Sequence, residues 1–541
     1  MRTDDSSSAP SSGSGPRLSD RALPGTRAAL PDYDRSQLST GIVHIGVGGF
    51  HRAHQAAVLD DLQARGEAAH WGITGVGALV GDTRMRDALN DQDGLYTLTL
   101  KHPDGRREHR VIGSIRDMVV APEDPWGAVE LMADPATRIV SLTITEGGYN
   151  FDQSTGLFDE TTPAVAHDLA LLREDTVVAV PDPQDGGGLR SVFGLVVDAL
   201  QKRRQRGIAP FTVMSCDNIQ GNGDTAAQQF IAFAELVDLR LAQWIRERVP
   251  FPNSMVDRIT PVTADADREN VLTDTGRLDA WPVVCEPFFQ WVLEDRFVPG
   301  PDGAPGRPDF EKAGVQLVED VEPYELMKLR LLNASHQALC YPGRLAGLEY
   351  AHEVCSDPLY VAYLMAYMEL EATPTLREVP GVDLEDYRRT LIERFANPEI
   401  RDTLARLCAE ASDRIPKWLV PVIRENLEAG RPVELCATIV ASWARYAQGA
   451  DEAGRPFEIV DPRRDAVLRA AARQAEDPLA FLRSAELFGD LAQRPAFTEP
   501  YLRALRTFRT RGARAALEEV LEITGRPVAR DDGAGASRPR S

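Results

Sequence analysis

The residues best suited to chemistry lie in one apolar segment, residues 323–336 (PYELMKLRLLNASH). Pro323 and the acids around it predict a helix N-terminus, and leucines on several sides of the helix predict that it is buried. Its polar members are Glu325, Lys328, Asn333 and His336. At 100° per residue, Lys328 and His336 lie about 80° apart and Glu325 about 60° from Lys328, so these three share one broad face.

A buried lysine suits acid–base chemistry on an alcohol. Burial disfavours the ammonium form, so it lowers the pKa of Lys328 toward neutrality, as a general base for a hydroxyl requires. Asn333 can donate a hydrogen bond to a developing alkoxide or carbonyl oxygen, and His336 can orient a hydroxyl. Glu325 either relays a proton to solvent or pairs with Lys328. The alternative is a structural ion pair beside a core histidine with satisfied hydrogen bonds.

Lysine is rare in this chain. Only five of its 60 basic residues are lysines, and the others are arginines. Arginine cannot lose its proton in a protein, whereas a desolvated lysine can. A retained lysine is therefore either a candidate for acid–base chemistry or a solvent-exposed residue kept by chance. The five are Lys101, Lys202, Lys312, Lys328 and Lys417.

A second candidate site is the glycine-rich segment 41–54 (GIVHIGVGGFHRAH). A β-branched run enters Gly46 and Gly48, and a helical pattern follows. In a dinucleotide-binding turn the first glycine forms the tight turn, and the second lets the backbone approach a pyrophosphate. His51 stands at the third glycine position, which loosens the packing of helix on strand. The segment indicates either a dinucleotide site or a glycine turn of another α/β fold.

An acid after the second predicted strand bears on the choice of cofactor. Residues 72–82 (GITGVGALVGD) end at Asp82, which would bind ribose hydroxyls and repel a 2′-phosphate, favouring NAD over NADP. The same residue could instead cap a helix that begins at Thr83. His51 and His54 have a spacing that metal ligands use, but no cluster of Cys, Asp or Glu accompanies them, so no metal is expected.

The arrangement of elements predicts an α/β domain followed by a mainly α-helical one. Strand patterns at 41–46, 72–76, 138–145 and 211–215 alternate with helical patterns at 51–66, 191–207 and 223–246, which predicts a parallel sheet with helices on both faces. After residue 320 helical patterns dominate: 322–345, 358–370, 384–395, 400–411, 418–428, 435–447 and 466–474. The predicted divisions are a disordered extension (1–25), the α/β domain (38–320), the helical domain (321–526) and a disordered tail (527–541).

The composition excludes several classes of partner. A net charge of −22 and a pI near 5.0 argue against nucleic acid and anionic membranes, which need a basic surface. The N-terminus lacks the apolar stretch of a secretory signal, and no run is long enough to span a membrane. Six scattered cysteines without a CxxC pair indicate free thiols in a reducing compartment, so a cytoplasmic location is expected.

Seven segments together resemble the polyol-specific long-chain dehydrogenases, the mannitol dehydrogenase family. They are GVGGFHRAHQA (46–56), DGLYTLTLKHPDG (93–105), SLTITEGGYN (141–150), MSCDNIQGNG (214–223), FPNSMVDRITP (251–261), EPFFQWVLEDRF (286–297) and YELMKLRLLNASH (324–336). The resemblance covers about residues 40 to 500. It implies a Rossmann-type N-terminal domain, a mainly α-helical C-terminal domain, an NAD(P) cofactor and no metal.

The resemblance also implies roles for individual residues. Lys328 matches the general base, and Asn218 and Asn333 match the pair that polarises the substrate oxygen. The residues that match holders of substrate hydroxyls are His336 and Asp257, with Arg414 and Lys417 as further substrate contacts. The expected cofactor residues are Ile45, Gly46, Val47, Gly48, Gly49, Phe50, His51, Asp82, Thr145, Glu146 and Gly147.

The expected reaction is hydride transfer from C2 of a polyol such as mannitol to NAD in a cleft between the domains, with Lys328 taking the hydroxyl proton. The expected partners are a small polyol and its ketose, and the chain is expected to be a monomer or a small homo-oligomer. Two alternatives stay open. Hexuronate reductases such as fructuronate reductase share these motifs, and their carboxylate substrates need an additional cation. An NAD-binding regulatory protein with a degraded site would lack the intact set of polar residues.

Overall fold

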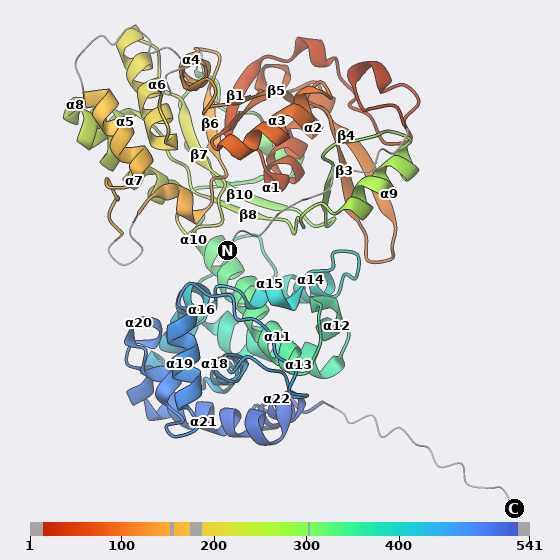
Figure 1. Ribbon diagram of the computed structural model, residues 1–541, viewed down its shortest axis with the longest axis vertical. Coiled ribbons are helices and arrows are strands. Elements are labelled where there is room, and N and C mark those ends of the chain that lie inside the picture. Colours follow the sequence, from red (N-terminus) through yellow and green to blue (C-terminus); the bar gives the residue numbers. More distant parts are fainter. Residues whose placement is uncertain (1–14, 152–155, 174–186, 301–302, 529–541) are drawn as a thin grey trace, which may run out of the picture. The chain divides into compact units, whose positions relative to one another are not determined.

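The computed structural model describes residues 15–151, 156–173, 187–300 and 303–528 of the chain (Figure 1). They form two compact units that divide between Glu322 and Pro323, close to the division predicted after residue 320. The first unit contains all the strands of the described part of the chain, and the second is helical. The predicted succession of an α/β domain and a helical domain is therefore confirmed.

The centre of the first unit is a five-stranded sheet of order β5-β2-β1-β6-β7 in which every pair of neighbours is parallel. Four of its strands lie where the alternation of β-branched runs predicted them. The chain first builds outward from β1 in one direction and then returns to build in the other, which is the strand order of a Rossmann-type sheet. The strands are β1 (Thr40–Ile45), β2 (Gly72–Gly77), β5 (Ile115–Val120), β6 (Ile139–Leu142) and β7 (Thr212–Ser215).

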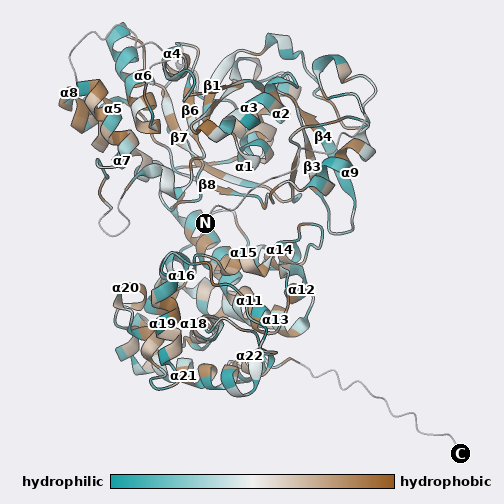
Figure 2. Cartoon of the chain, in the orientation of Figure 1, coloured by the Kyte–Doolittle hydropathy of each residue, from teal (hydrophilic) through white to brown (hydrophobic). Residues whose placement is uncertain are grey.

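The two faces of this sheet are covered differently. Val43 and Ile45 of β1 point into a core shared with helices α4 (Pro125–Ala133) and α6 (Val192–Arg206). Ile42, just before Val43, points to the opposite face and packs with α2 (Gln55–Ala64). Alternate residues of a strand face opposite sides, so a strand covered on both faces is apolar throughout. Figure 2 shows this pattern as hydrophobic strands beneath helices of mixed colour.

Strands as well as helices cover the second face, which the sequence pattern did not predict. Two three-stranded sheets, β11-β10-β8 and β4-β3-β9, contribute to the same core as Ile42. Their members are β3 (Tyr96–Lys101), β4 (Arg107–Ile112), β8 (Ser254–Asp257), β9 (Val283–Cys285), β10 (Gln290–Glu294) and β11 (Gln316–Val318).

Side chains cap the start of several helices of the first unit. The Ser191 hydroxyl accepts the Gly194 N–H at the start of α6, and Gly207 ends this helix with a left-handed φ of 68°. The predicted helix at 51–66 is interrupted at His54, and the one at 223–246 at Asp238. The remaining helices are α1 (Gly49–Ala53), α3 (Thr83–Asn90), α5 (Pro163–Arg173), α7 (Asn222–Val237), α8 (Leu239–Arg248) and α9 (Asp265–Thr275).

Part of the predicted disordered extension is folded. Leu18 is fully buried with Leu95 and Val111, and the Leu18 N–H donates to the Leu278 carbonyl. The predicted disorder is therefore wrong for residues 15–25, because a single apolar side chain between polar residues gives no periodic signal but still fills a pocket of the domain. Residues 1–14 and 529–541, which make up most of the other residues predicted to be disordered, lie outside the described residues.

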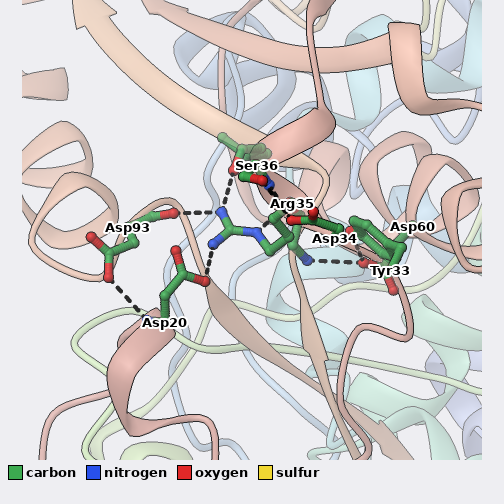
Figure 3. A network of polar contacts seen from close by, with 9 residues as sticks. Asp20, Tyr33, Asp34, Arg35, Ser36, Asp60 and Asp93 are labelled. Atoms are coloured by element: carbon green, nitrogen blue, oxygen red, sulfur yellow. Dashed lines mark hydrogen bonds and ion pairs between the residues drawn. The ribbon is translucent and has the colours of Figure 1, made fainter.

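A polar network fastens the chain that follows this segment (Figure 3). The Arg35 guanidinium donates to the carbonyls of Gly113, Asp93 and Ile115 and pairs with Asp20. The Tyr33 hydroxyl donates to the buried carboxylate of Asp60 at 2.6 Å. Burial raises the pKa of Tyr33, so its hydroxyl stays protonated and remains a donor.

The second unit is a helical domain. Helix α18 is buried along nearly its whole length and packs against α11 and α21. Pro and Gly lie in many of the connections between the helices, as predicted, although Pro342, Pro416 and Pro500 lie inside helices. Helices α21 and α22 follow the last helical pattern that the sequence predicted. The helices are α10 (Glu322–Met327), α11 (Ala334–Leu345), α12 (Ala351–Cys355), α13 (Pro358–Tyr367), α14 (Leu384–Phe395), α15 (Leu404–Cys408), α16 (Ala411–Trp418), α17 (Val420–Glu428), α18 (Glu434–Tyr446), α19 (Arg464–Arg473), α20 (Ala485–Phe488), α21 (Pro495–Thr510) and α22 (Gly512–Ile523).

Within the described ranges, no helix has the length and apolar character needed to cross a membrane. All six cysteines are buried free thiols, as their scattered spacing predicted.

Candidate functional site

The predicted cofactor residues come together at one edge of the parallel sheet. Segments 46–50, 78–82 and 143–149 follow the carboxyl ends of β1, β2 and β6, and Asn218 follows β7. Because these four strands are parallel neighbours, their carboxyl ends share one edge, and ligands of open α/β sheets bind outside that edge. The order of strands reverses between β1 and β6, so the crevice predicted for a ligand lies between segments 46–50 and 143–149.

The glycine turn after β1 has two glycines with different requirements. Gly46 adopts a φ of 94°, and a Cβ built there would stand 2.2 Å from the Thr143 carbonyl oxygen. Gly48 has an ordinary φ of −109°, and the nearest atom to a Cβ built there is the Gly46 oxygen at 3.8 Å. The fold itself therefore requires glycine at 46, whereas at 48 the protein leaves the space open to a ligand.

Two stacked imidazoles lie beneath this turn. His44 of β1 and His51 of α1 stack with ring centroids 3.4 Å apart, and both side chains are fully buried. The His44 ring is hydrogen bonded to the Ser141 and Thr143 hydroxyls, and the Thr143 hydroxyl donates to the Gly46 carbonyl at 2.7 Å. Burial lowers the pKa of His44 to about 3, and burial together with His44 lowers that of His51. Both rings are therefore neutral, and the His51 side chain is buried against His44.

Asp82 lies just beyond β2, where an acid that reads the ribose is expected. Its carboxylate accepts the Leu79 N–H at 2.9 Å, and its Cβ packs against Gly77, the last residue of β2. Its side chain makes no hydrogen bond to the first turn of α3. The capping alternative therefore applies to the turn at 79–82 rather than to the helix that begins at Thr83.

The segment after β6 holds a strained residue. Thr145 has a φ of 62° and a ψ of 168°, a conformation that is rare outside glycine and costs about 1–3 kcal/mol. Asp217 compensates for this, because its carboxylate accepts the N–H groups of Thr145 and Ile144 at 2.8 and 3.1 Å and the Tyr149 hydroxyl at 2.8 Å. Burial raises the pKa of Asp217, while these hydrogen bonds lower it.

Asp217 was not among the residues predicted for the site. It precedes the predicted Asn218 in the segment MSCDNIQGNG, so an acid two residues after the predicted strand 211–215 was the available signal. The carbonyl of Asp217 is also held, because it accepts the Asn222 side-chain amide at 2.9 Å. The same amide donates to the Ser254 carbonyl at 2.7 Å, which ties the segment after β7 to the start of β8. The residue before Asn218 is therefore held through both its side-chain carboxylate and its backbone carbonyl.

Asn218 and Asp257, the predicted substrate residues of the first unit, differ in exposure. Asn218 is exposed, whereas Asp257 ends β8, is 6% exposed and pairs in register with Gln290 of β10. Two residues after Asp257, the Ile259 N–H donates to the buried Glu286 carboxylate at 2.6 Å. The chain direction after Asp257 is thus set by hydrogen bonds rather than by a regular element.

The segment that carries the predicted base is not a regular α-helix. Residues Lys328–Asn333 form a π-helical turn between α10 and α11. The angles calculated at 100° per residue are therefore wrong across this turn, because a π-helical turn contains more residues than an α-helical one. The predicted burial is confirmed: Glu325, Lys328 and Asn333 are each less than a tenth exposed. Lys328 begins the turn and Asn333 ends it.

His336 lies in the first turn of α11, and its ring packs against Phe395 with centroids 4.8 Å apart. Arg414 is engaged within its own region. Its guanidinium pairs with Glu410 at 2.8 Å and donates to the Arg406 and Leu407 carbonyls, where α15 ends. Lys417 is exposed on α16. Among the described residues no group of three or more His, Cys, Asp or Glu side chains is arranged to hold a metal ion.

These features define an oxidoreductase-type architecture: a dinucleotide-binding α/β domain followed by a helical domain with a buried lysine on a π-helical turn. Two family profiles match the chain, "Mannitol dehydrogenase Rossmann domain" over residues 40–302 and "Mannitol dehydrogenase C-terminal domain" over residues 320–508. The chain therefore belongs to the mannitol dehydrogenase family.

Individual relatives agree with this assignment. A mannitol 2-dehydrogenase from Aspergillus fumigatus is 44% identical over 473 residues, covering 87% of this chain and 90% of the relative. One from Pyrenophora tritici-repentis is 44% identical over 91% of this chain and 83% of its own. The structure of Pseudomonas fluorescens mannitol 2-dehydrogenase in ternary complex with NAD and D-mannitol matches with a TM-score of 0.81 and 44% identity over 94% of this chain and 99% of that one.

A D-sorbitol dehydrogenase in substrate-free form gives a TM-score of 0.83 at 36% identity, over 93% of this chain and 100% of that one.

Proposed function

We propose that this chain is an NAD-dependent oxidoreductase that oxidises D-mannitol, or a related polyol, to the ketose D-fructose by removing hydride from C2. The observation that carries the proposal is the 44% identity, over nearly the full length of both chains, to an enzyme whose structure holds NAD and D-mannitol. The architecture fits such a cofactor. The turn at Gly48 leaves room for a ligand at the edge of the sheet, and we assign the ribose to Asp82, which follows β2 at the same edge.

In this proposal each predicted residue has one task. Lys328 accepts the proton of the substrate hydroxyl at its Nζ, while Asn218 and Asn333 donate hydrogen bonds to the oxygen that becomes the carbonyl. His336 and Asp257 hold neighbouring hydroxyls. When bound, NAD supplies the acceptor for the hydride that leaves C2. The C–H and O–H bonds of the substrate break, a C=O bond forms, and the proton stays on Lys328 until solvent removes it.

Substitution of the lysine tests the base. Lys328→Ala removes the proton acceptor, so turnover should fall by about 10²–10⁴ with little change in NAD affinity. Lys312→Ala is the matched control, since Lys312 is an exposed lysine paired with Glu67 and Asp309. A Lys328 variant that keeps near-normal turnover at neutral pH would exclude this role.

The two asparagines give an independent test of the oxygen-binding site. Asn218→Ala and Asn333→Ala should each lower the rate of hydride transfer by about 10²–10³, the usual effect of removing one oxyanion donor. The rate is measured in single turnovers from the appearance of NADH. Unchanged rates in both variants would refute the assignment.

The substrate itself is tested with a panel. Purified protein and NAD are mixed with mannitol, arabinitol, sorbitol, mannonate or altronate, and NADH formation is followed by absorbance. Turnover on a neutral polyol supports the proposal and identifies the substrate. Turnover confined to the two aldonates would instead assign a hexuronate reductase.

We also propose a cytoplasmic location, supported by six buried cysteines that are all free thiols. Fractionation of the source cells, with the chain detected by antibody, tests this. Recovery in a secreted or membrane fraction would refute it.

A further inference from the structure

The π-helical turn Lys328–Asn333 creates a specific problem of hydrogen bonding. In an α-helix the Ala334 N–H would bond to the Arg330 carbonyl four residues earlier. Here the Ala334 N–H donates to the Leu329 carbonyl, five residues earlier. The Arg330 carbonyl has thus lost its α-helical donor, and it lies in the interior of the domain.

A side chain from another helix supplies a donor. Tyr367, the last residue of α13, is fully buried, and its hydroxyl donates to the Arg330 carbonyl at 3.0 Å. Burial raises the pKa of Tyr367 well above its usual value, so the hydroxyl keeps the proton that it donates. Tyr367 directly precedes a second π-helical turn, Met368–Ala372, which contacts the first.

The side chain of Arg330 fixes the same turn from a second direction. Its guanidinium forms a two-pronged ion pair with Glu425 of α17, with N–O distances of 2.8 and 2.6 Å, and also donates to the Thr375 carbonyl at 2.6 Å. The Arg330 side chain is only 7% exposed. A planar guanidinium held by two parallel hydrogen bonds has a fixed direction, so it constrains the backbone that carries it.

We infer that Tyr367 and the Arg330–Glu425 pair are positioning residues that hold the π-helical turn and thereby fix the directions of the Lys328 and Asn333 side chains. The inference rests on the proposed function, because it assigns the two ends of this turn to the base and to an oxygen-binding amide. Helix geometry supports it: a change from π to α at this turn would rotate Asn333 relative to Lys328 by roughly the angle of one residue, 100°.

The chain offers a matched pair of variants. Tyr367→Phe removes the hydroxyl that bonds to the turn. Tyr363→Phe, one helical turn earlier on α13, removes an equally buried hydroxyl that bonds at 3.3 Å to the Leu435 carbonyl instead. Both changes delete one buried hydroxyl–carbonyl hydrogen bond, so both should lower the melting temperature to a similar extent.

Only Tyr367→Phe should affect the chemistry. We expect its kcat for polyol oxidation to fall about 10- to 100-fold, as a displaced catalytic group predicts, with the KM for NAD unchanged. We also expect the pH profile of kcat to shift. Tyr363→Phe should keep both properties. Equal kcat values and equal pH profiles in the two variants would overturn the inference.

A second measurement does not depend on turnover. Because the chain has five lysines, protein labelled with ¹³C at lysine Cε gives five signals, and Lys328→Met identifies that of Lys328. Its chemical shift, followed across pH, should differ from wild type in Tyr367→Phe and match wild type in Tyr363→Phe. If wild type oxidises no polyol, the proposed function fails, while this titration still decides whether Tyr367 positions Lys328.

A milder variant covers the case in which Tyr367→Phe does not fold. Glu425→Gln keeps the shape of the acceptor, and the Glu425 side chain is 42% exposed, so the fold should survive. The Lys328 signal should shift in the same sense. An unchanged signal would count against the Arg330–Glu425 part of the inference.

Discussion

The two glycines of the turn after β1 allow stability and cofactor binding to be separated. In Gly46→Ala the new Cβ would stand 2.2 Å from the Thr143 carbonyl oxygen, a backbone atom that cannot rotate away. The left-handed backbone adds about 1–2 kcal/mol for any residue with a Cβ. In Gly48→Ala the Cβ meets no protein atom closer than 3.8 Å, and φ is ordinary.

The expected results follow from this contrast. Gly48→Ala should keep the free energy of unfolding within about 1 kcal/mol of wild type, since its largest cost is a slightly poorer helix N-cap. It should nevertheless raise the Kd for NAD at least tenfold, about 1.4 kcal/mol, because the methyl group occupies the space through which the backbone meets the pyrophosphate. Gly46→Ala should lower the melting temperature of the free protein by several degrees, at about 2–4 °C per kcal/mol.

The assay needs two measurements on each variant: thermal unfolding without cofactor and calorimetric titration with NAD. Gly66→Ala is a suitable reference for the left-handed backbone alone, since Gly66 has a φ of 76° and a Cβ there meets nothing within 4 Å. A Gly48→Ala protein that is stable and binds NAD as tightly as wild type would refute the placement of the pyrophosphate at this turn.

Three other predictions concern Asp217, Arg35 and Glu371. Asp217→Asn replaces one carboxylate oxygen with an amide N–H₂, which cannot accept a hydrogen bond, so the N–H of either Thr145 or Ile144 loses its acceptor. The substitution should therefore cost about 1–3 kcal/mol of stability and raise the KM for NAD. An unchanged KM would mean that the strained Thr145 segment does not contact the cofactor. Arg35→Ala should lower the melting temperature and expose residues 15–34 to trypsin, whereas Arg21→Ala, at an exposed position, should do neither; equal cleavage would refute the anchoring role. Burial raises the pKa of Glu371 from 4.5 to about 7, so the folded state favours the protonated acid and loses stability as pH rises across that interval, by up to a few kcal/mol. Melting temperatures measured from pH 4.5 to 8 should fall more steeply for wild type than for Glu371→Gln, and parallel curves would contradict the shift.

Local patterns in the sequence predicted the succession of the two domains and four strands of the parallel sheet. The runs at 41–46 and 211–215 predicted buried parallel strands, because a strand covered on both faces is apolar throughout. Gly46 marked the turn, since only glycine adopts its φ without strain, and the apolar surroundings of Lys328 predicted its burial. These features depend on interactions within a few residues, so sequence spacing records them.

Tertiary structure alone decided how the sites are held. Leu18 is buried by residues far along the chain, Asp217 holds the strained Thr145 from a different strand end, and the hydroxyl of Tyr367 completes the π-helical turn that begins at Lys328. Over only six residues, the apolar spacing typical of a π-helical turn differs too little from that of an α-helical turn to distinguish the two in a sequence. What distinguishes them is whether a donor from another helix reaches the displaced carbonyl, and that depends on the packing of the folded domain.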